Sequence, residues 1–168
     1  GNTHGGGPPT IADFDGDGVP DVATAGGVGY AVFDGAALVD PGVAGPATLL
    51  WIQPTVDCSS ASTGSTVFDF DGDGVAEVVY SDQQRLRIYD GPTGNVLVET
   101  CNTTATLIEN PVVADVDNDG HADIVAVSNA YASGSPGIQC NDGVSNGQSG
   151  VRVFSAADNS WVRTRRIW

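Results

Sequence analysis

Acidic residues recur with one spacing in three nine-residue stretches of the chain. Residues 13–21 read DFDGDGVPD, residues 69–77 read DFDGDGVAE, and residues 115–123 read DVDNDGHAD. Each stretch has a carboxylate at positions 1, 3, 5 and 9 and a glycine at position 6. A calcium ion takes about six to eight oxygen ligands, and carboxylates on alternate residues of a tightly curled loop converge on one point. The pattern therefore predicts three calcium-binding loops.

The predicted ligands are side-chain carboxylates and one main-chain oxygen in each loop. Glycine at position 6 allows the sharp turn that directs the carbonyl of position 7 inward. The expected ligand sets are Asp13, Asp15, Asp17, Val19 and Asp21 in the first loop, Asp69, Asp71, Asp73, Val75 and Glu77 in the second, and Asp115, Asp117, Asp119, His121 and Asp123 in the third. The ring of His121 is expected to point away from the metal, because its main chain holds the ligand position.

The loops are predicted to join strands rather than helices. An EF-hand needs a bidentate Glu at position 12 and a helix on each side, whereas position 12 here is Thr24, Tyr80 or Ala126. The residues after each loop are short, β-branched runs without helical periodicity. Position 9 is therefore expected to close each site. A single such loop could be a plain acidic turn, since Asp and Gly are ordinary turn residues; three aligned copies favour metal binding.

Composition indicates one all-β domain with a real core. The chain has 168 residues, 40% of them apolar, with 23 Gly and 9 Pro that suit many short strands. Its net charge is −15, but twelve of the 21 acidic residues lie in the three loops, so three divalent ions would bring the balance to −9. The remaining acidity argues against a nucleic-acid partner. Neither a signal peptide nor a membrane span is visible, and the missing initiator Met suggests a processed chain or a fragment.

Three units of strands surround the loops. From loop position 1 to the aromatic residue of the third strand is 20 residues in the first two units (Asp13 to Phe33, Asp69 to Tyr89) and 39 in the third (Asp115 to Phe154). The third unit therefore carries an insertion within residues 129–150, which is expected to be an exposed loop. Repeats of four short strands are typical of β-propeller blades. The predicted blades cover residues 8–56, 64–101 and 110–168, as three four-stranded antiparallel sheets in a partial propeller or part of a larger ring.

These loops and strands resemble the FG-GAP or VCBS-type calcium-binding repeats found in the integrin alpha-subunit head and in many secreted bacterial proteins. Phrases such as FDFDGDGVAEVVY, LRIYDGPTG and VRTRRIW look like large secreted repeat proteins of myxobacteria. The resemblance covers nearly the whole chain and implies an extracellular or cell-surface propeller with calcium near its rim. Such propellers usually close with more blades than three, so the chain is expected to associate with itself, with missing blades of a longer chain, or as a filament.

Cysteine pairing and glycosylation remain open at this level. If the protein is exported, two disulfides are candidates, Cys101–Cys140 and Cys58–Cys101. Either one leaves the third cysteine unpaired within the chain, and three free thiols are the alternative. The sequon at Asn102 is a candidate glycan acceptor.

Two functions follow from the pattern. The leading one is a calcium-stabilised extracellular module with a structural, adhesive or self-assembly role, without enzymatic activity, because neither His4 nor His121 lies in a nucleophile motif. The alternative is a carbohydrate-binding or glycan-hydrolysing propeller with its site in the loops between blades, including residues 129–150. The tryptophans and tyrosines could stack on sugars, but at strand positions they more often pack the core.

Overall fold

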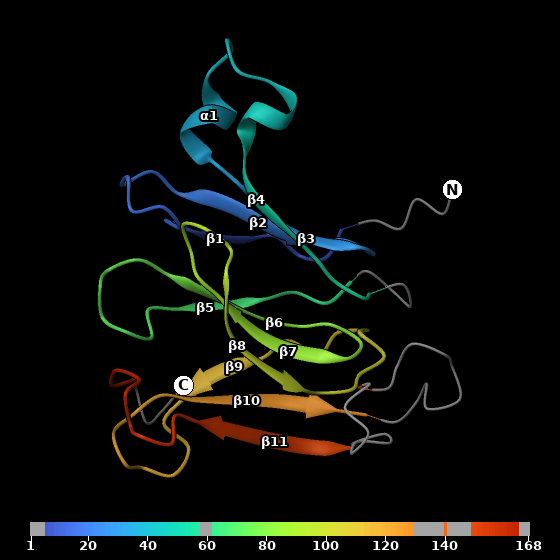
Figure 1. The fold of residues 1–168 in the computed structure, drawn as a ribbon, viewed down its shortest axis with the longest axis vertical. Helices are drawn as coiled ribbons and strands as arrows, with labels where there is room; N and C mark the ends of the chain where they lie inside the picture. Colours follow the sequence, from blue (N-terminus) through green and yellow to red (C-terminus); the bar gives the residue numbers. More distant parts are fainter. Residues whose placement is uncertain (1–5, 58–61, 130–139, 141–148, 165–168) are drawn as a thin grey trace.

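The computed structural model describes residues 6–57, 62–129, 140 and 149–164, and within them the chain forms three antiparallel sheets. The first sheet contains β1 (Thr10–Ala12), β2 (Asp21–Ala25), β3 (Gly29–Phe33) and β4 (Leu49–Pro54). The second contains β5 (Thr66–Phe68), β6 (Glu77–Ser81), β7 (Arg85–Tyr89) and β8 (Val96–Cys101). The third contains β9 (Val112–Ala114), β10 (Asp123–Ser128) and β11 (Gly150–Ser155). The sheets follow one another along the long axis of the molecule, each strand beside its sequence neighbour (Figure 1).

The all-β prediction and the three-sheet arrangement are confirmed, with two differences in the connections. The β3–β4 connection holds a short helix, α1 (Gly35–Val39), and a 3-10 helix, η1 (Gly45–Thr48). Asp34 caps α1 by accepting a hydrogen bond from the amide of Ala37, a local signal that the Gly and Pro content of this connection concealed. The fourth strand expected at the end of the third sheet is not seen in residues 160–164, and residues 165–168 lie outside the described part.

Two apolar layers hold the three sheets together. Between the first and second sheets, Tyr30 packs against Tyr80 with ring centroids 5.0 Å apart and stacks on Trp51 at 5.9 Å. Between the second and third sheets, Val79 and Ile124 are fully buried. Side chains alternate between the two faces of a strand, so the second sheet uses one face for each neighbour.

The outer face of the third sheet repeats the buried faces of the other two. Pairing matches Val125 with Val153 and Val127 with Val151, as it matches Val79 with Ile88 in the second sheet. Val79 and Ile88 are 0% and 2% exposed beneath the third sheet, whereas Val151 and Val153 are 71% and 49% exposed. On the opposite outer face of the molecule, Ile11 and Ile52 of the first sheet are 57% and 58% exposed. Both ends of the stack therefore present apolar sheet faces.

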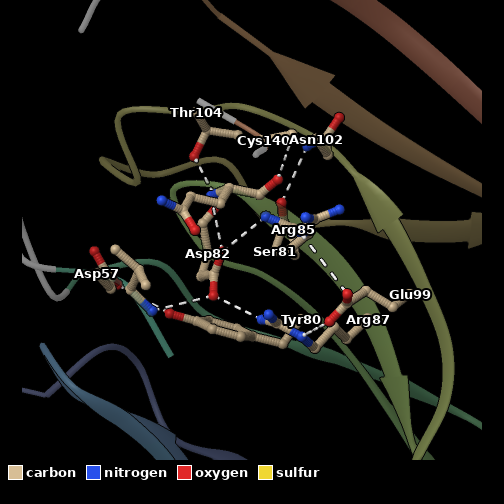
Figure 2. A network of polar contacts seen from close by, with 12 residues as sticks. Asp57, Tyr80, Ser81, Asp82, Arg85, Arg87, Glu99, Asn102, Thr104 and Cys140 are labelled. Carbon is tan, nitrogen blue, oxygen red and sulfur yellow. Dashed lines mark hydrogen bonds and ion pairs between the residues drawn. The ribbon is translucent and has the colours of Figure 1, made fainter. Parts of the chain in front are cut away.

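A polar network connects the sheets at the ends of the strands away from the acidic loops (Figure 2). The fully buried Asp82 carboxylate accepts hydrogen bonds from the amide of Val56 and from Arg87 Nη1, at 3.1 and 2.7 Å. Tyr80 donates its hydroxyl to Asp57 at 2.9 Å. Burial, followed by the charge of Asp57, raises the pKa of Tyr80, so the phenol remains a donor. The connection from the first sheet is thereby fixed to the second.

Cys101 and Cys140 form a disulfide, which ties the end of β8 to the long connection between β10 and β11. This is one of the two pairings that the sequence left open; Cys58 lies outside the described residues. The sequon residue Asn102 is fully buried, and its Nδ2 donates to Ser81 Oγ at 3.0 Å and to the Val127 carbonyl at 3.2 Å. The folded chain therefore has no room for a glycan at Asn102, which corrects the expectation of an acceptor there.

No helix in the described ranges is long and apolar enough to cross a membrane.

Replacement of Gly35 by alanine is expected to destabilise the fold severely. A Cβ at Gly35 would lie 1.9 Å from the Pro20 carbonyl oxygen, whereas a Cβ at Gly26 would lie 3.5 Å from its nearest neighbour, an ordinary contact. We expect Gly35→Ala to lower the free energy of unfolding by about 3 kcal/mol or more, and Gly26→Ala to change it by less than about 1 kcal/mol. Urea denaturation of both variants measures the difference; equal stabilities would contradict the close approach.

Loss of the disulfide is expected to lower stability without changing the sheets. The bond closes a loop across a sequence separation of 39, for which chain entropy estimates a contribution of about 4 kcal/mol. Denaturation of a Cys140→Ser variant measures this contribution, with Cys58→Ser as the control that leaves the bond intact. A Cys140→Ser variant as stable as the wild type would show that the bond adds no constraint.

Candidate metal centres

The three acidic loops each connect the first two strands of a sheet, and they lie along one side of the molecule, on the left in Figure 1. They span residues 13–21, 69–77 and 115–123, which places their ends in register with the paired strands that they join. The three candidate centres are therefore equivalent positions of successive sheets rather than one shared site.

Carboxylates at positions 1, 3 and 5 organise the backbone of each loop. In the first loop, Asp13 Oδ2 accepts from the amide of Gly18 at 2.9 Å, Asp15 from that of Asp17 at 3.1 Å, and Asp17 from that of Val19 at 2.7 Å. The same bonds recur in the second loop at 3.0, 3.2 and 2.8 Å and in the third at 3.1, 3.1 and 2.7 Å. These bonds curl each loop so that its carboxylates face inward.

Position 9 closes each loop from the strand that follows. Asp21, Glu77 and Asp123 are 0%, 5% and 2% exposed. Each accepts a hydrogen bond from the amide of loop position 2, at 2.8, 2.7 and 2.8 Å. The second oxygen of Asp21 accepts from the amide of Gly35 at 2.8 Å, and that of Asp123 from the Ser155 hydroxyl at 2.5 Å. The position-9 carboxylate therefore fastens each loop to its sheet, and in the second and third loops it also joins the candidate centre.

Two positions in each loop have left-handed backbone. Position 6 was expected to be so, and Gly18, Gly74 and Gly120 have φ of 86, 92 and 94°. Position 4 shares the conformation, with φ of 77, 81 and 71° at Gly16, Gly72 and Asn118. Asn tolerates this region better than other side chains do, which explains how the third loop departs from glycine without changing shape. The ligand spacing drew attention only to position 6.

The structure brings part of each predicted ligand set together. Ligand atoms lie within 4.8 Å of one another in three groups: Asp13, Asp15 and Asp17; Asp69, Asp71 and Glu77; Asp115, Asp117 and Asp123. Positions 1 and 3 thus converge in every loop, joined by position 5 in the first and by position 9 in the second and third. At position 7 the amides of Val19, Val75 and His121 donate to the position-5 carboxylate, and main-chain oxygens as ligands there stay a prediction.

The electrostatics of the second loop fit a cation between its carboxylates. Burial raises the pKa of Glu77 to about 7, and the charges of Asp71, Asp69 and Asp73 add to this rise against the hydrogen bond from Phe70. In the first loop, burial also raises the pKa of Asp15, with Asp21 and Asp17 contributing repulsion. Neighbouring carboxylates repel one another, so each opposes the ionisation of the next. A hard divalent cation between them removes this repulsion and takes their oxygens as ligands. The residues therefore fit calcium.

The segment after β11 bridges the second and third loops. Val162 donates its amide to the Phe70 carbonyl at 2.9 Å and accepts one from Ala122 at 3.0 Å. The His121 ring is turned toward this segment, with Nδ1 2.8 Å from the Trp161 carbonyl oxygen. The segment predicted to be the fourth strand of the third sheet thus connects the second and third acidic loops through Val162.

Comparison with known proteins supports the repeat character of the chain. The model of the FG-GAP-like repeat matches residues 47–126, which contain the second and third loops. A solved structure, the crystal structure of the V. cholerae biofilm matrix protein Bap1, is similar to this chain with a TM-score of 0.67 and 28% sequence identity. The similarity covers 89% of this chain and 22% of that one, so the chain spans about a fifth of the length of that protein. No curated protein matches the chain.

Replacement of Glu77 by glutamine is expected to separate the two roles of position 9. Glutamine keeps an oxygen that accepts from Phe70 but removes the charge that the neighbouring aspartates oppose. We expect Glu77→Gln to retain or raise the melting temperature without calcium and to reduce the rise that calcium produces. Differential scanning calorimetry in calcium and in excess chelator measures both, and Asp40→Asn, an exposed position away from the loops, is the control. A variant with the full calcium response would exclude Glu77 as a ligand.

Proposed function

We propose that this chain is a calcium-binding segment of an extracellular structural or adhesive protein, and that its three sheets are blades of a β-propeller. The observation that carries the proposal is the repetition of one acidic loop, with converging carboxylate oxygens, at the same place in three consecutive sheets. One such cluster is common on protein surfaces. Three in register with a sheet repeat are better explained by a shared ligand.

Calcium would supply positive charge between the carboxylates and a rigid oxygen-coordinated centre when bound. The residues of the chain do the rest. Positions 1, 3 and 5 shape the loop, and position 9 anchors it to the second strand of the sheet. Loss of the ion is expected to restore repulsion among buried and half-buried carboxylates, which loosens the loop at its anchored end.

An extracellular place for the chain rests on three features. The FG-GAP-like repeat match and the similarity to a biofilm matrix protein favour a structural or adhesive role outside the cell. The Cys101–Cys140 disulfide is typical of oxidising compartments. No enzymatic role is proposed, because the carboxylates that could act as acid and base are assigned to metal binding.

The partner that fits the open ends of the stack is a further blade of the same kind. The exposed valines of the third sheet occupy positions that, in the second sheet, are buried by the sheet that follows. Apolar sheet faces left in water favour association. In a longer chain the next blade would cover this face, and for the chain alone a second copy would do so, pairing the third sheet of one copy with the first sheet of the other.

A second candidate function is carbohydrate binding, with or without hydrolysis. The residues expected to form its site, within 129–150, lie largely outside the described part of the chain. The observation that favours sugar binding is instead a cavity between the second and third sheets.

Association through the open face is tested by the mass of the chain in solution. We expect the wild-type chain to form an oligomer at tens of micromolar in calcium, measured by analytical ultracentrifugation, and to loosen in excess chelator. Val151→Glu should favour the monomer, because it places a charge on the apolar face. Ile108→Glu is the matched control, since Ile108 is 86% exposed on a loop away from that face. A monomeric wild-type chain in calcium would contradict self-association.

A further inference from the structure

A cavity of about 210 Å³ opens between the second and third sheets, beside the second acidic loop. Its lining comprises Phe70, Asp71, Glu77, Ile88, Leu97, Val98, Ser160 and Trp161. Phe70, Glu77 and Ile88 are buried, whereas Asp71, Leu97 and Ser160 are exposed. The cavity therefore has a mostly apolar interior and an open mouth, which the metal-binding proposal does not require, and two carboxylates at one end.

The equivalent space between the first and second sheets is filled. Trp51 pairs with Val32 in the first sheet as Val98 pairs with Ile88 in the second, so Val98 stands where Trp51 stands one sheet earlier. The Trp51 ring is 7% exposed and donates Nε1–H to the Gly91 carbonyl at 2.6 Å. The exchange of tryptophan for valine leaves the second junction open where the first is closed.

Trp161 forms an aromatic wall of the cavity from the side of the third sheet. Its ring centroid lies 4.8 Å from that of Phe70, at an interplanar angle of 56°. The backbone on either side is fixed, because the Trp161 carbonyl lies 2.8 Å from His121 Nδ1 and the amide of Val162 donates to Phe70 at 2.9 Å. The indole is thus held in place before any ligand arrives, which limits the entropy lost on binding.

The acidic end of the cavity coincides with the second candidate metal centre. Asp71 and Glu77 line the cavity and belong to the converging group with Asp69. Calcium takes about six to eight oxygen ligands, so the five predicted from this loop leave about one to three positions for other oxygens. A ligand in the cavity is placed to supply them.

We propose that this cavity binds one sugar ring of a glycan, in a manner that depends on calcium at the second loop. The inference rests on the proposed metal binding. The C–H face of a pyranose packs on the indole of Trp161, and two neighbouring hydroxyls provide oxygen ligands at the acidic end. The volume suits a single ring, being smaller than the roughly 300–1,000 Å³ of pockets for drug-sized ligands. An aromatic side chain of a partner would suit the walls, but it brings no pair of oxygens to the ion.

The test measures binding of methyl glycosides of glucose, mannose, galactose, fucose and N-acetylglucosamine by saturation-transfer NMR and titration. We expect at least one of them to bind the calcium-loaded chain and to lose binding in excess chelator. Val98→Trp with Asn159→Gly should weaken that binding at least tenfold, because it fills the cavity as Trp51 fills its counterpart. Asn159 is changed to glycine because it is the counterpart of Gly94 in the third unit. A Cβ added at Gly94 would lie 2.4 Å from the Trp51 ring, so the residue that faces the new tryptophan must also lack a Cβ. Val96→Trp is the matched control, on the same strand but not lining the cavity.

A second variant covers failure of the filled form to fold. Leu97→Lys lies at the mouth, where Leu97 is 55% exposed, and is expected to weaken sugar binding at least threefold with an unchanged melting temperature. Absence of glycoside binding, or binding that both variants leave unchanged, overturns the inference. The inference is also overturned if peptides containing tryptophan bind the chain without calcium and no glycoside binds it. Calcium-dependent melting of the same samples separates the outcomes, since a calcium response without sugar binding leaves the proposed function standing, and the loss of both removes it.

Discussion

The hydrogen bond from the amide of loop position 2 to the carboxylate of position 9 is the constraint on which each sheet depends. It joins Phe14 to Asp21, Phe70 to Glu77 and Val116 to Asp123, and its acceptor is buried in all three sheets. A buried carboxylate needs hydrogen bonds or a cation to remain ionised. In the second and third sheets, the same bond that fastens the loop to the sheet therefore brings one more negative group toward the carboxylates of positions 1 and 3. This arrangement forms the acidic centre that we propose as a divalent-cation site.

Packing between sheets depends on the same region. The backbone of Gly35 approaches that of Pro20 just before position 9, and Gly91 approaches Ala76 at the corresponding point of the second sheet. Side chains at these two positions would separate the third strand from the loop. The closeness of strand, loop and glycine turn explains why the acidic loops and the sheet junctions form one structural unit.

The three repeats differ most in the side chains that fill the two junctions between sheets. The first junction is closed by an indole from the earlier sheet, and the second is walled by Trp161 from the later one. The loop beside the open junction is also the one that uses Glu in place of Asp at position 9. A structural repeat has in this way acquired a concave surface next to an acidic centre without altering its strand pattern.

The sequence by itself determined the features that depend on local spacing: the three acidic loops, the glycine turns at position 6, and the order of the strands in the chain, eleven of the twelve predicted being present in the described residues. These follow from the preferences of short segments, which the residue types record directly. Tertiary structure decided the features that depend on distant segments: the choice of Cys140 as the partner of Cys101, the burial of Asn102, whether position 5 or position 9 joins the converging carboxylates of a loop, and the bridge from Val162 to two loops. The cavity belongs to this second group, because its walls come from four separate segments, and because only strand pairing shows that Val98 stands where Trp51 stands one sheet earlier.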